Sequence, residues 1–207
     1  MAMSLAALIA AGALLCPGPS TSQQLVTVQA PPRATVGVLT LWQQSRGSCF
    51  RRIAGPWRAY LGRSGLSAQK REGDGGTPTG TFRFGPTMYG VEPSPGVSFA
   101  YHRLTCGDWW DEDPSSAQYN RFEHVACGAK PSFGGGSEAL WRIVPQYRYF
   151  AVIEYNTHPA VRGRGSAIFL HVSAGRPTAG CISLPEAELL RTLRWLRPGA
   201  IIRIGVT

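Results

Sequence analysis

Long apolar runs are almost absent from this sequence. Outside residues 4–15, no segment approaches the roughly 20 apolar residues that a membrane-spanning helix requires. Residues 4–15 are apolar but too short to cross a bilayer comfortably, and the Pro/Ser-rich stretch after them is typical of a secretory signal. We therefore expect a secreted or cell-wall-associated protein, with signal cleavage between about residue 18 and residue 30 and no stable membrane span afterwards.

Internal repeats and low-complexity tracts are also absent, and helical periodicity is confined mainly to residues 185–196. A chain of 207 residues with 43% hydrophobic content can bury one sizeable core, and 25 Gly with 16 Pro indicate many turns between short strands. We predict a signal and short linker over residues 1–30, then one mainly β domain with a single C-terminal helix over residues 31–207. The segments expected to form strands are 34–42, 49–53, 57–61, 82–84, 149–155, 167–171 and 200–204.

Acidic side chains are scarce. Against 21 Lys and Arg there are 12 Asp and Glu, which gives a formal net charge of +9, and residues 1–30 contribute none of this charge. A basic exported protein is attracted to polyanions. The arginines are scattered, without a basic helix or an RNA-binding aromatic signature, which argues against nucleic acid. An anionic cell wall is the expected partner.

The central residues 85–148 contain many Gly, Pro and Trp, which indicates a long insertion that acts as a functional lid or as a structural flap. In an exported chain, Cys106 and Cys127 are expected to form a disulfide that closes a loop of about 20 residues. Cys49 is then left as a half-buried thiol, with pairing to Cys106 or Cys127 still open. A lipid anchor at Cys16 is the alternative to a cleaved secretory signal.

Cys181 is the most informative residue because an imidazole, His171, lies ten positions before it. The apolar stretch 166–170 indicates a buried strand that ends at His171, and a turn of small residues leads to the thiol. After the thiol, Ser183 and Glu186 have capping-box spacing ahead of a helix. We therefore predict a thiol in a strand-to-helix connection, where the helix amino end, a nearby arginine and an imidazolium lower its pKa.

Small residues at Ala179 and Gly180 allow the backbone amides of Gly180 and Cys181 to approach a developing oxyanion, a contribution of roughly 3 to 4 kcal/mol. Acyl transfer is the reaction class that this pattern favours. The alternative is structural: a cysteine after glycine is usually a buried small hydrophobe, and a histidine at a strand end is often simply hydrogen-bonded.

Two separated motifs resemble the L,D-transpeptidase catalytic domain family. Residues 168–204 are similar to its signature, in which a strand-end histidine precedes Ser/Thr-x-Gly-Cys, a helix and a last strand; here the motif is Thr178 to Cys181. Residues 72–82 contain the matching block TPTGTF, and together the resemblance spans roughly residues 35–206. The run Cys106-Gly-Asp-Trp-Trp-Asp and the three glycines 134–136 resemble the insertion of an actinobacterial-type branch.

The resemblance implies a β-sandwich or barrel, and we expect no metal and no cofactor. The family's donor is a peptidoglycan tetrapeptide stem, whose terminal D-alanine leaves as a thioester forms; transfer to the side-chain amine of a second stem gives a 3-3 cross-link, and carbapenems are expected to acylate the same cysteine. The residues to which we assign roles are Cys181 as nucleophile and His171 as base, Gly180 and Ala179 for the oxyanion, Ser173 or a backbone carbonyl for orienting His171, and Thr178, Tyr155 and Arg176 for substrate binding.

The sequence departs from the family pattern at two positions. Ala179 stands where the commoner motif has histidine, and Val172 stands where it has glycine. These changes leave the nucleophile assignment in place but put the acceptor in doubt. If water replaces the amine, the protein is an L,D-carboxypeptidase. If activity is lost, it is a cell-wall-binding module.

Other chemistry-bearing residues have weaker assignments. His158 is a rival base, but it lies in a loop before proline. His102 and His124 could be combined with Cys106 and Cys127 as zinc ligands, yet their spacing matches no compact zinc arrangement, and oxidised thiols could not coordinate. The acidic residues of the insertion are expected to be solvated; they are Asp108, Asp111, Glu112 and Asp113.

Overall fold

A computed structural model of the chain describes residues 14–16, 22–45, 47 and 49–207. Its main sheet has ten strands and closes on itself, because β3 pairs with both β2 and β4. The closed path is β4-β14-β13-β12-β7-β15-β2-β3, with β1 attached to β4 and β8 to β7. The strands are β1 Leu14–Leu15, β2 Gln24–Ala30, β3 Val36–Gln44, β4 Phe50–Tyr60, β7 Gly80–Gly90, β8 Ala100–Arg103, β12 Phe150–Ile153, β13 Phe169–Val172, β14 Ile182–Leu184 and β15 Ile201–Val206.

The smaller elements complete the fold. Strands β5 (Leu66–Ser67) and β6 (Thr77–Pro78) pair with each other. Strands β9 (Asp108–Asp111), β10 (Arg121–His124) and β11 (Glu138–Ala139) form a separate three-stranded sheet. Two short 3-10 helices, η1 (Leu140–Arg142) and η2 (Gln146–Arg148), lead back to β12. A mainly β, barrel-like fold with one α-helix, α1 (Glu186–Trp195), confirms the predicted class.

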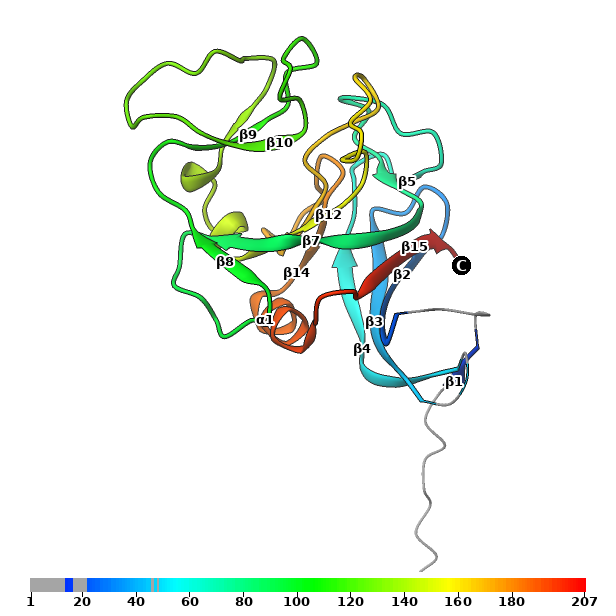
Figure 1. The fold of residues 1–207 in the computed structure, drawn as a ribbon. Helices are drawn as coiled ribbons and strands as arrows, with labels where there is room; N and C mark the ends of the chain where they lie inside the picture. The colour runs from blue at the N-terminus through cyan, green and yellow to red at the C-terminus, as the bar shows by residue number, and fades with distance from the viewer. Residues whose placement is uncertain (1–13, 17–21, 46, 48) are drawn as a thin grey trace, which may run out of the picture.

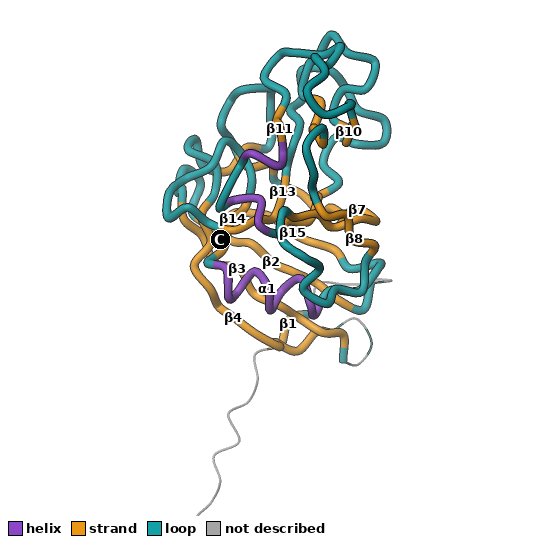
Figure 2. The backbone as a smooth tube through the Cα atoms, turned by 90° about the vertical axis from the view of Figure 1, so that its left-hand side faces the viewer, coloured by secondary structure: helices purple, strands orange, loops and turns teal. Residues whose placement is uncertain are grey.

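The helix and the insertion cover opposite faces of the sheet. Figures 1 and 2 both show α1 on one side of β7 and the β9-β10-β11 sheet on the other. Leu189 and Leu193 lie one helical turn apart and are fully buried against one hydrophobic cluster of the sheet. A second cluster lies under the insertion, where Trp110 and Tyr147 pack on Phe169. Each buried large side chain of this kind contributes about 1.5 to 3 kcal/mol to folding.

Three predicted boundaries differ from the structure. Strand β2 lies within residues 1–30, where we expected signal and linker; it pairs with β3 and β15 and is almost wholly buried, so the folded unit begins before residue 31. The two predicted strands 49–53 and 57–61 are one strand, β4. Strand β7 runs to Gly90, because its later residues pair with β12 and β8, so the insertion starts after that residue.

Two disulfides are present. Cys106 and Cys127 are bonded, as predicted, with their Cα atoms 5.2 Å apart. The prediction of a free thiol at Cys49 is wrong, since it bonds Cys16. The same Cys16 sulfur cannot also carry a lipid, and cleavage after residue 16 would remove half of this bond. Most of the apolar stretch 4–15 lies outside the described residues, and among those described no helix is long and apolar enough to cross a membrane.

Candidate active site

Parallel pairing of β13 with β14 brings the candidate base and nucleophile to one face of the sheet. His171 is opposite Ser183, and Cys181 immediately precedes β14. Because side chains alternate along a strand, Phe169, His171, Cys181 and Ser183 share the face under the insertion. The residues between them face the cluster beneath α1; they are Leu170, Val172, Ile182 and Leu184.

Cys181 and His171 line one cavity of about 350 Å³. Both are nearly enclosed, with exposed fractions of 8% and 6%. The other lining residues come from the loop before Cys181, from β14, from the insertion and from the segment after β4. They are Arg63, Glu138, Ile143, Gln146, Tyr147, Ala174, Arg176, Pro177, Thr178, Ala179 and Ser183.

His171 is held as a neutral imidazole. Its Nδ1 lies 2.8 Å from the carbonyl oxygen of Val172, which fixes the proton on Nδ1 and leaves Nε2 as an acceptor. Burial lowers the pKa of His171 to about 4. The backbone carbonyl therefore orients the ring, whereas the Ser173 hydroxyl accepts a hydrogen bond from the Gly175 amide.

Cys181 is a neutral thiol at rest. Its Sγ lies 3.1 Å from the Ala167 carbonyl oxygen, to which the S–H donates, and it accepts the Phe169 N–H at 3.3 Å. Burial raises the pKa of the Cys181 thiol well above its ordinary value, and the carboxyls of Glu138 and Glu112 raise it further. The expected thiolate of depressed pKa is wrong for the resting protein.

Neither the helix nor the arginine lowers the thiol pKa as expected. Strand β14 separates Cys181 from the helix, so the thiol is not at the helix amino end. The residue that caps α1 is Pro185, without a side-chain hydrogen bond, and Ser183 lies in β14 instead of serving as a capping residue. Arg176 is exposed at the rim of the cavity. Enclosure therefore outweighs the charges that the sequence placed nearby.

Thr178 shapes the loop that carries the nucleophile. Its Oγ1 donates to the Cys181 carbonyl oxygen at 2.6 Å and accepts the Gly180 N–H at 3.1 Å. Its backbone amide donates to the Leu61 carbonyl, and its own carbonyl accepts the Arg63 N–H. The Gly180 amide, which we expected to hold an oxyanion, is thus already bonded within the loop at rest.

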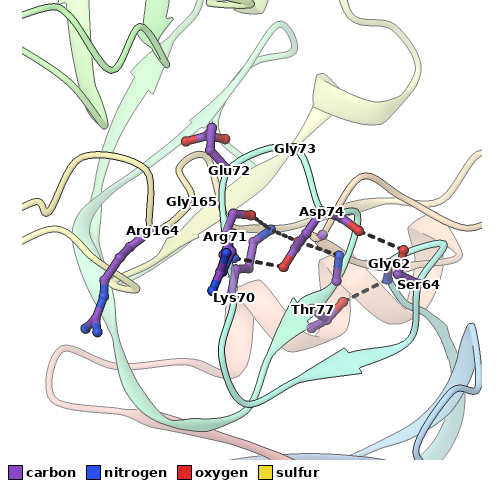
Figure 3. Close-up of polar contacts among 12 residues, drawn as sticks. Gly62, Ser64, Lys70, Arg71, Glu72, Gly73, Asp74, Thr77, Arg164 and Gly165 are labelled. Atoms are coloured by element: carbon purple, nitrogen blue, oxygen red, sulfur yellow. Dashed lines mark hydrogen bonds and ion pairs between the residues drawn. The ribbon is translucent and has the colours of Figure 1, made fainter.

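The segment 62–77 lies against this loop, because the Gly62 backbone forms a bridge with Thr178. Figure 3 shows the polar contacts within this segment. Thr77 Oγ1 accepts the Gly62 N–H at 2.8 Å. Asp74 accepts hydrogen bonds from the Lys70 ammonium at 2.7 Å and from the Arg71 and Gly76 amides at 2.8 Å each. The residues just before the TPTGTF block are therefore tied together by polar contacts beside the nucleophile loop.

Gly180 is needed where the two loops touch. A Cβ there would lie 2.9 Å from the Gly76 carbonyl oxygen and 3.2 Å from Ile168 Cδ1, at a φ of +150° that side chains rarely adopt. We predict that Gly180→Ala lowers acylation of Cys181 at least about 10-fold and the free energy of unfolding by about 1 to 3 kcal/mol. Acylation kinetics and denaturant unfolding measure the two effects.

Gly175→Ala is the matched control for this substitution. Gly175 belongs to the same loop and has a positive φ of +73°, but its added Cβ would meet nothing within 4 Å. Gly175→Ala should lower the free energy of unfolding only through the strain of a positive φ, and Cys181 should be acylated at nearly the unsubstituted rate. Equal losses of acylation in both variants would show that contact with Gly76 does not position the nucleophile.

The structure separates the other predicted residues from this cavity. Tyr155 donates to the Arg164 carbonyl and packs edge-on against Phe82, so it does not line the cavity. His158 is 76% exposed and lies 3.8 Å from Glu154 in another part of the surface. Of the three substrate-binding candidates, only Thr178 and Arg176 are at the site.

The acidic residues of the insertion are not all solvated, which corrects our expectation. Asp108 and Asp111 are fully buried. Asp108 binds the Nε2 of His102 at 2.9 Å and the Nδ1 of His124 at 2.7 Å, so these imidazoles serve the insertion's own packing. Their cysteine neighbours are oxidised, and the described residues contain no group of side chains suited to hold a metal ion.

Sequence reasoning missed two residues that the insertion contributes. The Tyr147 hydroxyl donates a hydrogen bond to Glu138 Oε2, and its ring lies 5.7 Å from the His171 ring at 81°. Neither residue belongs to a recognisable motif. Glu138 lies just after the glycine run, and nothing in the sequence distinguishes it from the other acidic residues of the insertion. Only the folding of the insertion over β13 brings them to the cavity.

Comparison with known families gives one match. The model for YkuD, the L,D-transpeptidase catalytic domain, matches residues 40–204, most of the chain. The match includes the TPTGTF block and both candidate catalytic residues, and it identifies the family without distinguishing a branch within it. Searches among curated proteins and among solved structures return no match.

Proposed function

Since the chain belongs to the L,D-transpeptidase catalytic-domain family, we propose that it joins peptidoglycan stem peptides by acyl transfer through Cys181. The support is one cavity that contains both the Cys181 thiol and the His171 imidazole. The Val172 carbonyl accepts the Nδ1–H of His171 and so leaves Nε2 free to accept a proton. Two disulfides indicate an oxidising, extracytoplasmic location, where this substrate lies. We further propose that the protein is secreted and associates with the cell wall.

In the first half-reaction His171 Nε2 takes the thiol proton as sulfur attacks the carbonyl carbon of the donor stem. The neutral resting pair fits this role, because the imidazole is unprotonated at neutral pH and ready to accept. Backbone amides of the nucleophile loop donate hydrogen bonds to the oxyanion. Either the Gly180 N–H leaves its hydrogen bond to Thr178 and donates to the oxyanion, or the Cys181 N–H donates instead. The His171 proton then passes to the leaving D-alanine nitrogen, and the thioester remains.

In the second half-reaction an amine of another stem attacks the thioester and forms a 3-3 cross-link. Arg176 and Thr178 at the cavity wall are the proposed contacts for stem carboxylate and carbonyl groups. Hydrolysis of the same thioester would make the protein an L,D-carboxypeptidase. A wall-binding module without activity is the third reading, motivated by Ala179 and Val172.

Product analysis separates these readings. Purified protein with stem tetrapeptide should yield cross-linked dimer together with released D-alanine. Tripeptide without dimer would identify the carboxypeptidase. Unchanged tetrapeptide, with no acyl-enzyme by intact mass, would leave only the binding module and overturn the proposal.

A further inference from the structure

Glu138 is a carboxyl on the cavity wall that the steps above do not use. It lies in β11, where pairing with Trp110 of β9 holds its backbone. The Tyr147 hydroxyl donates a hydrogen bond to Glu138 Oε2, and the Tyr147 ring packs edge-on against the rings of Phe169 and His171. The insertion therefore presents an oriented carboxyl to the same cavity as the thiol.

A row of carboxyls continues from Glu138 into the protein. Glu138 and Glu112 interact electrostatically, and Glu112 Oε2 lies 3.4 Å from the Ser166 hydroxyl. Ser166 in turn donates to Glu72 Oε2 at 2.9 Å. Glu112 Oε1 is buried without a hydrogen-bond partner among the described side chains and backbone. A carboxylate in that position would be unsolvated, so Glu112 holds a proton.

The contacts favour a proton on Glu112 and a charge on Glu138, because Glu112 Oε1 is buried without a partner while Glu138 accepts the Tyr147 hydroxyl. Burial raises the pKa of Glu112 to about 9, and the neighbouring carboxyls add to the effect. Burial also raises the pKa of Glu138, but the hydrogen bond from Tyr147 opposes that shift and stabilises the anion. Its raised pKa makes the Glu138 carboxylate a stronger base than a carboxylate in water.

A carboxylate here is unfavourable for the first half-reaction. Glu138 raises the pKa of Cys181 and so opposes formation of the thiolate that attacks the donor. Its presence at the wall is better explained by the second half-reaction, in which the attacking group arrives as a cation. At pH 7 only about one in a thousand alkylamine molecules is unprotonated, and an ammonium cannot attack a thioester.

Resting on the proposed function, we propose that Glu138 is the catalytic residue that binds the acceptor ammonium and removes its extra proton. The ammonium transfers H⁺ to the Glu138 carboxylate, which becomes a carboxylic acid. The freed nitrogen lone pair forms the N–C bond at the thioester carbon. As the C–S bond breaks, its electrons return to Cys181, and the second nitrogen proton passes to His171 and then to the sulfur. Glu138 finally releases its proton to solvent, which restores the starting state.

This assignment also predicts a preference for amine over water. A neutral water molecule gains little from a buried carboxylate, whereas an ammonium is both attracted and activated. The charged or titratable groups that face Glu138 in the cavity or next to it are Arg63, Glu112, Tyr147, His171, Arg176 and Cys181.

The test compares Glu138→Gln with the unsubstituted protein in both half-reactions. Glutamine keeps the shape and can still accept from Tyr147, but it cannot take a proton. Transfer from the acyl-enzyme to an alkylamine at pH 7 should fall about 100-fold relative to acyl-enzyme formation. Transfer to an alkoxyamine, which is unprotonated at pH 7, should fall by less than about threefold. In the variant, alkylamine transfer should rise tenfold per pH unit below the pKa of the amine.

Glu123→Gln in β10 is the control, because Glu123 belongs to the same insertion but does not line the cavity. If Glu138→Gln lowers acyl transfer to alkylamine and to alkoxyamine equally, Glu138 has a purely structural role. That result would overturn this inference and leave the proposed function in place. Unchanged alkylamine transfer would do the same. If the unsubstituted protein forms no acyl-enzyme, the proposed function fails and the inference fails with it.

Discussion

Replacing Cys181 with serine is expected to lower acyl-enzyme formation with a carbapenem at least about 1000-fold. The serine hydroxyl can still accept the Phe169 N–H and donate to the Ala167 carbonyl, so the fold should be retained. A buried alcohol, however, is a far weaker nucleophile than a thiol whose proton goes to a neutral imidazole. Intact-mass measurement over time gives the rate of adduct formation.

The matched variants for this prediction are Cys181→Ala and His158→Ala. The first should form no adduct, and the second should react like the unsubstituted protein because His158 is exposed and distant from the cavity. An adduct of unchanged rate on Cys181→Ala would place the reactive group elsewhere. The mechanism would then be wrong in its first step.

Replacing Glu112 with glutamine should stabilise the protein at alkaline pH. The folded state keeps the carboxyl protonated, with a pKa of about 9, whereas the unfolded chain ionises near 4.5. This raised pKa means that the unfolded state binds fewer protons between those values, so the stability contribution of Glu112 falls as pH rises. Glutamine is neutral in both states. We expect a gain of about 2 to 5 kcal/mol in the free energy of unfolding at pH 8.

Urea unfolding at pH 5 and pH 8 measures this effect. The difference between Glu112→Gln and the unsubstituted protein should be small at pH 5 and large at pH 8. Glu123→Gln, in the same insertion, should show no such difference between the two pH values. A Glu112→Gln variant that is less stable at pH 8 would indicate an ionised, well-paired Glu112. The assignment of a proton to Glu112 would then be wrong.

The sequence was informative about local chemistry. The apolar stretch before His171 predicted the strand that ends near it, and the small-residue turn predicted the loop that carries Cys181. Strand β14, which follows Cys181 and pairs in parallel with β13, was not predicted. Alternation along the chain predicted six of the fifteen described strands, and helical spacing predicted the single helix; the six strands are β3, β4, β7, β12, β13 and β15. The pairing of Cys106 with Cys127 followed from their position around one loop.

Predictions that depended on charge or on distant partners were less accurate. Cys49 was assigned as unpaired because its partner, Cys16, was attributed to a leader. Tyr155 was expected to bind substrate, yet it packs against Phe82, while Tyr147 of the insertion lines the cavity. Such choices cannot be made from spacing, since they depend on which loop folds over which face.

By itself, the sequence determined the identity of the nucleophile and base candidates, the β-rich class and the family, because these reside in contiguous motifs and side-chain alternation. Only the tertiary structure decided their protonation states and the carboxyl beside them. Enclosure under the insertion removes water from Cys181 and His171 and makes both neutral at rest. The same enclosure brings Glu138 to the thiol from a strand more than 40 residues away, a juxtaposition that no local pattern encodes.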